Sequence, residues 1–220
     1  MKIVIQCAGS KNTQLPGSGF HTTDGRLVKF VADPISAPSS DPYAYVRPDD
    51  LSDDQHTWRE RLLDYNKDVK SNPLHLFPAY RLYKNQVYER LVNEFGKNQV
   101  FILSAGWGLI SSDFLTPDYD ITFSNDKEKL YVRRRKSDHY ADLCQLPDDG
   151  DTIVFMGGKE YLPLFLKLTK ELTGKKIVFY NSYETPALGN GFYNEKFITT
   201  RNTNWHYSCA QALIDGIIKI

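Results

Sequence analysis

The sequence has few cysteines, no long apolar run and no excess of charge of either sign. Its three cysteines are scattered and odd in number, without C-x-x-C spacing, which argues against a disulfide framework or a zinc site. No apolar run approaches about 18 residues, so we expect no membrane contact. Because 27 basic residues balance 27 acidic ones, any binding to nucleic acid must depend on a local patch.

No signal peptide is apparent before the strand-like segment 2–5, and we therefore expect a cytoplasmic protein. Hydrophobic residues make up 41% of the chain and aromatic residues 13%, which is enough for a sizeable core and too much for a disordered chain. A length of 220 residues fits one large domain, so we predict a single domain over residues 1–220.

Four short apolar runs predict buried parallel strands at residues 3–6, 100–104, 152–156 and 176–180. The runs are β-branched or aromatic, and they are continuous rather than alternating, as expected where helices cover both faces of a sheet. Helical patterns separate them. The sequence therefore predicts an α/β protein with a doubly wound, mainly parallel sheet of at least four strands and helices on both faces.

Three apolar stripes with helical spacing accompany these strands, over residues 58–69, 80–95 and 162–172. The first is marked by Trp58, Leu62, Tyr65 and Val69. A final helix is predicted near the C-terminus, with Ser208 and Gln211 forming a capping box. The ends of the other helices are predicted at capping residues, namely Ser52, Gln55, Gly96 and Gly174.

Residues 12–78 do not follow the alternation of strand and helix. Segment 21–28 predicts a small hairpin, because Asp24-Gly25 fits a type I′ turn, and a polar, proline-rich stretch follows at 33–48. We interpret 12–78 as a hairpin-plus-helix insertion after the first strand rather than as a second domain. Insertions of this length over the carboxyl edge of a sheet often form lids or substrate walls.

Ligands of open α/β sheets bind beyond the carboxyl ends of the strands. Gly157 and Gly158 follow the third predicted strand and open a predicted helix, so their N–H groups are candidates to hold a phosphate; a plain tight turn is the alternative. Lys11, just past the first strand, is expected to neutralise a phosphate or to face solvent. Cys7 is more readily a buried small hydrophobe than a nucleophile.

Asp118 and Asp120 flank Tyr119 after a proline. In an extended segment both carboxylates share one side, where they can orient a water or stabilise an oxocarbenium-like transition state. Turn chemistry is the competing interpretation. We favour Asp120 as the catalytic residue, because the following Ile121 is expected to anchor it in the core.

The only strong basic run is 133–136, which we predict on a helix. Four successive helical residues cannot all face one way, so at least one should point inward or toward the site. The run contacts nucleic acid or forms a solvated face. His206, between Trp205 and Tyr207, combines an aromatic stack with a titratable group, and a core or capping role is its alternative.

Four segments, 7–11, 80–91, 103–110 and 117–121, together resemble the bacterial YaaA stress-protein superfamily. That group has a C-x-x-(S)-K start, an LSA-x-x-G-L strand end and a P-x-Y-D/R element. The order is also similar to the uracil-DNA-glycosylase-like domain attached to archaeosine synthases. The resemblance covers about residues 1–11 and 79–124. It implies a DNA- or base-handling protein, such as a glycosylase used against phages with modified DNA.

The leading hypothesis is an N-glycosylase that removes a base, modified or not, from double-stranded DNA. The alternatives are a non-catalytic DNA- or nucleotide-binding stress protein and a base-exchanging transferase acting on RNA. We expect no metal, no cofactor and no obligate protein partner.

Each role in the glycosylase hypothesis has candidate residues. Asp118 and Asp120 are the candidates for catalysis, Trp107 and Tyr119 for stacking, and Asn181 for hydrogen bonds to the base edge. Other substrate contacts are predicted at Ser10, Lys11, Ser104, Gly106, Gly157, Gly158, Ser182 and His206. The predicted contacts to the nucleic-acid backbone are Lys11, Arg133, Arg134, Arg135 and Lys136.

Overall fold

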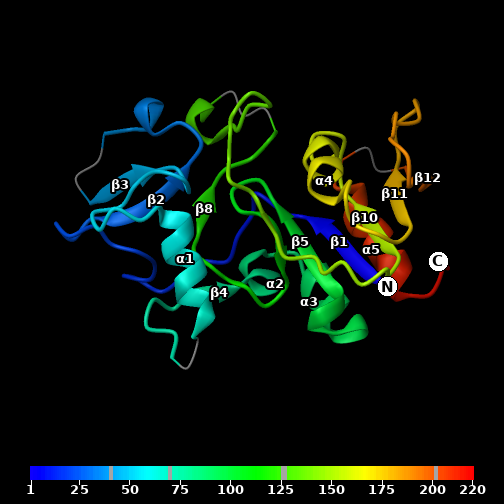
Figure 1. Cartoon of the computed structure of the whole chain (residues 1–220), viewed down its shortest axis with the longest axis horizontal. Coiled ribbons are helices and arrows are strands. Elements are labelled where there is room, and N and C mark those ends of the chain that lie inside the picture. Colours follow the sequence, from blue (N-terminus) through cyan, green and yellow to red (C-terminus); the bar gives the residue numbers. More distant parts are fainter. Residues whose placement is uncertain (40–41, 69–70, 125–127, 201–202) are drawn as a thin grey trace.

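The structure is a computed structural model that describes residues 1–39, 42–68, 71–124, 128–200 and 203–220 (Figure 1). Seven strands form the main sheet in the order β12-β11-β10-β1-β5-β6-β9, and all neighbours are parallel except β5 and β6. This confirms the predicted α/β class and its mainly parallel sheet. The strands are β1 (Lys2–Gln6), β5 (Val100–Ser104), β6 (Gly108–Ser111), β9 (Leu143–Cys144), β10 (Ile153–Met156), β11 (Lys176–Tyr180) and β12 (Phe192–Lys196).

The centre of the sheet is β1, which pairs with β5 on one side and with β10 on the other. The chain first winds from β1 to β5 and then returns across β1 to β10, β11 and β12. The winding direction therefore reverses at β1, and the loops that leave β1 and β10 diverge from each other. Such a reversal opens a crevice at the carboxyl ends of the two strands.

Three helices cover the main sheet. α3 (Val87–Phe95) and α5 (Trp205–Ile214) pack against each other, and α5 also contacts β1 and β10. α4 (Leu162–Thr169) connects β10 to β11, which lie on the opposite side of β1 from β5 in the strand order. The chain thus crosses over in opposite directions on the two sides of β1, and right-handed crossovers in opposite directions place their helices on opposite faces of the sheet. Its Phe165 ring stacks on Phe155 with centroids 4.3 Å apart. Helices on both faces explain why the strands are continuously apolar.

The helix predicted over 80–95 is divided into two. α2 (Ala79–Leu82) ends before Tyr83, whose backbone is extended and forms a bridge to Lys11. The amide of Asn12 also donates to the Leu82 carbonyl, so pairing with segment 10–12 takes these residues out of the helix. The predicted end at Gly96 is confirmed, with a φ of 85° that favours glycine.

Three other predicted helix ends are wrong. α4 ends at Thr169, and Gly174 instead occupies a tight turn where an added Cβ would lie 2.3 Å from the Asp151 carbonyl. α5 begins at Trp205, before Ser208. α1 (Trp58–Lys67) is capped by Thr57 and Glu60, which form a capping box, and not by Ser52 and Gln55; Val69 lies outside the described residues.

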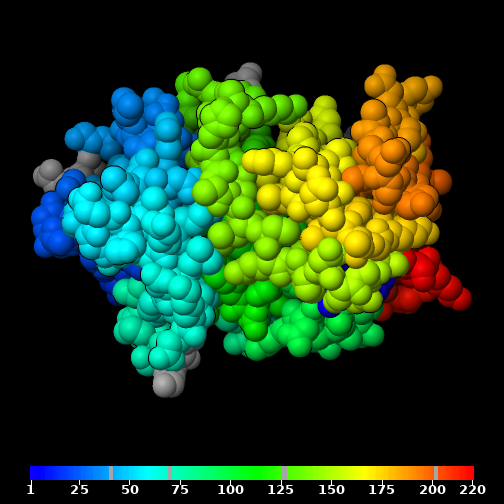
Figure 2. Space-filling model, viewed as in Figure 1, coloured from blue at the N-terminus to red at the C-terminus, as the bar shows by residue number. Residues whose placement is uncertain are grey.

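Residues 12–78 contribute no described strand to the main sheet. β2 (Leu27–Val31) and β3 (Tyr43–Val46) instead join β8 (Tyr119–Asp120) in a second, parallel sheet, and β4 (Phe77–Pro78) pairs with β7 (Leu115–Thr116). Phe30 of β2 packs on Trp107 with ring centroids 5.0 Å apart, so the two sheets share one core. In Figure 2 these residues, blue to cyan, lie directly against the green central segment.

The segment 12–78 differs in two details from the sequence prediction. His21 and Leu27 form the predicted antiparallel bridge, but only Gly25 has a positive φ, so the turn is not type I′. The polar stretch 33–48 contains β3, which was not predicted. The described residues also include three short 3₁₀ turns, η1 (Pro34–Ser36), η2 (Lys97–Gln99) and η3 (Leu130–Val132). None of the helices described is both long and apolar enough to cross a membrane.

Candidate functional site

The carboxyl edge of the sheets carries two cavities with no lining residue in common. The first, which we call the acid cavity, has a volume of about 410 Å³ and contains the predicted Lys11, Asp118, Tyr119 and Asp120. The second, the switch cavity, has a volume of about 580 Å³ at the reversal between β1 and β10. It contains the predicted Gly157, Gly158, Asn181, Ser182 and His206. The single site predicted from the sequence is therefore divided into two.

The two aspartates of the acid cavity lie at β8. This strand pairs with β2, with Tyr119 opposite Phe30 and Asp120 opposite Val31. Tyr119 is buried, whereas the side chains of Asp118 and Asp120 are 50% and 53% exposed and line one cavity. The predicted alternation is confirmed, and so is the burial of Ile121. The second sheet thus fixes the direction of both carboxylates.

Each aspartate has a lysine at the edge of ion-pair range. Lys11 Nζ lies 3.9 Å from the Asp118 carboxylate, and Lys129 Nζ lies 3.9 Å from that of Asp120. The Lys11 side chain is only 9% exposed, and its ammonium sits 4.5 Å from the centroid of the Tyr119 ring. Lys129 is largely exposed, so its pairing with Asp120 is weak and leaves that carboxylate open to a ligand.

Tyrosines form the opposite wall of the acid cavity. Tyr43 and Tyr45 lie on one side of β3, and the Tyr45 and Tyr131 rings meet edge to face with centroids 6.2 Å apart. Desolvation, followed by the neighbouring tyrosines, raises the pKa of Tyr45. The Tyr131 carbonyl accepts the amides of Ala32 and Asp33, which ties η3 to the end of β2. Sequence reasoning missed this wall, although the alternation Tyr43-Ala44-Tyr45-Val46 was a strand signal.

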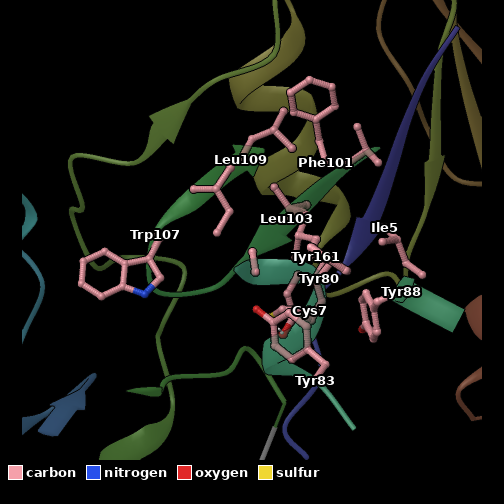
Figure 3. Close-up of a cluster of buried hydrophobic side chains, with 14 of the residues drawn as sticks. Ile5, Cys7, Tyr80, Tyr83, Tyr88, Phe101, Leu103, Trp107, Leu109 and Tyr161 are labelled. Atoms are coloured by element: carbon pink, nitrogen blue, oxygen red, sulfur yellow. Dashed lines mark hydrogen bonds between the residues drawn. The ribbon is translucent and has the colours of Figure 1, made fainter. Parts of the chain in front are cut away.

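Beneath the acid cavity lies a buried network of hydroxyl groups. Ser104 Oγ donates to the Tyr119 hydroxyl at 2.8 Å, and the Tyr83 hydroxyl lies 2.9 Å from that of Tyr119. Cys7 Sγ lies 3.2 Å from the Tyr161 hydroxyl, and Figure 3 shows Cys7 gathered with Tyr83 and Tyr161. Burial raises the pKa of Tyr83, Tyr119 and Tyr161 well above the usual value, so all three stay protonated. Cys7 is buried, as predicted.

The loop at residues 104–108 is part of the core rather than of a cavity wall. Ser104, Gly106 and Trp107 are buried, and the Trp107 ring is 0% exposed. Buried Arg59 donates to the carbonyls of Gly106 and Trp107 at 3.0 and 3.1 Å. Stacking on a base by Trp107 and substrate contacts from Ser104 and Gly106 are therefore contradicted. Stacking by Tyr119 is contradicted as well, because this side chain is only 2% exposed and Lys11 Nζ lies over its ring. Ser10 is exposed and lines neither cavity.

The basic run at 133–136 follows η3 and is not helical. Arg134 is 5% exposed; its Nη1 and Nη2 each lie 2.7 Å from the Asp142 carboxylate, and Nη1 also donates to the Ala105 carbonyl at 2.8 Å. The expectation that one residue points inward is confirmed by Arg134, and its predicted contact with a DNA phosphate is wrong. Arg133, Arg135 and Lys136 are exposed.

Gly157 and Gly158, which line the switch cavity, allow the chain to pack closely at this point. The amide of Gly158 donates to Gln6 Oε1 at 2.6 Å, and its carbonyl accepts the amide of Tyr161 in a turn before α4. A Cβ at Gly157 would lie 2.4 Å from the Phe155 ring. The glycines therefore form a tight turn, and the predicted phosphate cradle at a helix N-terminus is wrong. No described group of three or more His, Cys, Asp or Glu residues is placed to hold a metal ion.

Comparisons of the chain with protein-family models, with curated proteins and with solved structures found no match. The resemblance to the YaaA superfamily stays a prediction. The function proposed below therefore rests on the fold class and on the geometry of the acid cavity.

Proposed function

We propose that this protein is a DNA N-glycosylase, with catalysis in the acid cavity and Asp120 as the catalytic carboxylate. The observation that carries the proposal is the pairing of two half-exposed aspartates with three partly exposed tyrosines, Tyr43, Tyr45 and Tyr131, and three lysines around 410 Å³. A volume of this order holds one nucleotide unit. Tyrosine faces stack on bases, lysines neutralise phosphates, and carboxylates stabilise the cationic sugar of the transition state.

The two aspartates have different surroundings, and this decides their roles. Asp118 faces the largely buried Lys11, whose charge is held in place by the Tyr119 ring. Asp120 faces the exposed Lys129 and is fixed between two buried side chains, Tyr119 and Ile121. Asp120 is therefore the more available carboxylate, and its direction is fixed by its neighbours. Asp118 holds Lys11 in position for a phosphate.

The reaction needs no group beyond water. As the bond between the base nitrogen and the anomeric carbon breaks, positive charge develops on the sugar and the Asp120 carboxylate stabilises it. Water adds to the anomeric carbon and gives one proton to the carboxylate, which then releases it to solvent. The base leaves with its bonding electrons and takes up one proton from solvent, so the carboxylate is regenerated and the reaction consumes one water. The products are a free base and an abasic sugar in DNA.

The proposed partner is double-stranded DNA with the target base turned out of the helix. Arg133, Arg135 and Lys136 are exposed and follow Tyr131 of the cavity lining closely in the chain, and we expect them to contact phosphates of the bound DNA. We expect the protein to act in the cytoplasm. The resemblance adds the expectation of modified phage DNA as substrate.

The test is incubation of the protein with unmodified and with phage-modified duplex DNA. Released bases are identified by chromatography, and abasic sites by strand breaks after hot alkali. A glycosylase gives both products. DNA that is bound but stays intact would instead support a non-catalytic DNA-binding protein. A preference for ribose substrates would support the base-exchanging RNA transferase.

A further inference from the structure

The switch cavity takes no part in the reaction proposed above, yet it occupies the place where open α/β sheets bind ligands. Its floor is Gln6 at the end of β1, beside the turn that follows β10. It is the larger of the two cavities, at about 580 Å³ against 410 Å³. What the cavity holds must be inferred from the chemistry of its walls.

The lining of the switch cavity includes a buried side chain with an unpartnered nitrogen. His206 lines the cavity and is 3% exposed, and its Nε2 forms no hydrogen bond within the part of the chain that the structure describes. A buried nitrogen without a hydrogen bond is costly, which indicates that a partner belongs there. Burial lowers the pKa of His206 to about 4, so the ring is neutral near pH 7, with one donor and one acceptor nitrogen.

A second hydrogen-bonding group lies at the floor. Gln6 Oε1 accepts the amide of Gly158, which fixes the orientation of the Gln6 side chain. The same side chain carries an NH₂ group with two N–H donors. Gln6 thus adds hydrogen-bonding groups to those of His206 along the lining of the cavity. Such a surface suits the edge of a planar heterocycle.

The remaining walls supply flat apolar surface. Trp205 is buried and lies nearly parallel to the Phe197 ring, and Phe179 also lines the cavity. At the mouth, Tyr183 is 97% exposed, which is unusual for a large aromatic side chain. Lys159 and Glu160 also lie at the lining, and their opposite charges favour no net charge in the ligand.

We infer that the switch cavity is a second binding site, separate from the acid cavity, for the base of a free nucleoside. His206 and Gln6 bind the edge of the base, Trp205 borders it, and Tyr183 stacks on its open side. The site requires no glycosylase activity, so it stands or fails independently of the proposed function.

The test is titration of the purified protein by isothermal calorimetry with adenosine, guanosine, cytidine and uridine separately. We expect at least one nucleoside to bind with one-to-one stoichiometry. His206→Phe keeps an aromatic ring but removes both nitrogens, and we expect it to weaken binding about tenfold. Tyr183→Ala should weaken binding about fivefold or more because stacking is removed. The second variant alters only an exposed side chain, so its folding is not in question.

Two controls make the result specific. Tyr193→Ala removes another exposed tyrosine, which does not line the cavity, and should leave the affinity unchanged. Asp120→Asn should also bind nucleoside like the wild type, which separates this site from the acid cavity. The inference is overturned if no nucleoside binds at millimolar concentration, or if the tightest binding is equal in His206→Phe, Tyr183→Ala and the wild type.

Discussion

The sequence predicts ligand contacts both in the loop at 104–108 and in the segment at 117–121. In the structure the polar groups of the loop are bonded within the chain, whereas the aspartates of the segment are half exposed. In the loop, the carbonyls of three successive residues accept from Arg59 or Arg134, and the Ser104 hydroxyl is bonded to Tyr119. In the segment, Asp118 and Asp120 leave half of each side chain to solvent. Polar groups that are satisfied within the chain build a rigid support, and those left open are available to a ligand.

The largest expected effect is a loss of stability when the hydrogen bonds that hold the loop at 104–108 are removed. Arg134→Ala leaves the Asp142 carboxylate, whose side chain is 1% exposed, without its main partner, and frees the Ala105 carbonyl. Breaking a buried pair in this way costs about 3–5 kcal/mol of unfolding free energy. Urea unfolding measures the decrease. Arg135→Ala, at the exposed next position, is the matched control and should stay within about 0.5 kcal/mol of the wild type. Equal decreases would remove the distinction between the two positions.

A buried polar group without a partner should make stability depend on pH. Burial lowers the pKa of His206 from 6.5 to about 4 in the folded chain. Between these values the unfolded chain binds a proton that the folded chain does not, so stability falls as pH falls through this window, by about 3 kcal/mol at pH 4. His206→Phe should lack this part of the decline. Urea unfolding at several pH values checks it, and identical pH profiles would contradict it.

A smaller effect is expected at the exposed basic residues. Replacing Arg133 and Arg135 together by Ala should weaken DNA binding and lower the slope of log affinity against log salt by about one for each phosphate that is no longer neutralised. Lys170→Ala, just after α4, changes an exposed charge away from both cavities and should leave the slope unchanged. Fluorescence anisotropy at several salt concentrations gives the slopes. If the double variant keeps the wild-type slope, the run is a solvated face.

The sequence predicted four of the seven described strands of the main sheet, and not β6, β9 and β12, because only the four have a strong local signal. Continuous β-branched runs marked β1, β5, β10 and β11, and alternation around Tyr119 placed both aspartates on one side. The second sheet was missed because β2, β3 and β8 are joined by pairings between distant segments. For the same reason the sequence could not show that Ser104 is bonded within the core whereas Asp118 is open to a ligand. Their difference depends on Arg59 and Arg134, which no local pattern connects to the loop.

The most direct test of the account compares Asp118→Asn and Asp120→Asn for release of base from DNA. Thermal melting confirms folding, and DNA affinity is measured beside activity. We predict that Asp120→Asn lowers the rate of release by about 100-fold or more while affinity stays within about twofold, since a carboxylate that acts in the transition state contributes on this scale. Asp118→Asn should have a smaller effect. Full release by both variants would contradict the assignment of catalysis to the acid cavity.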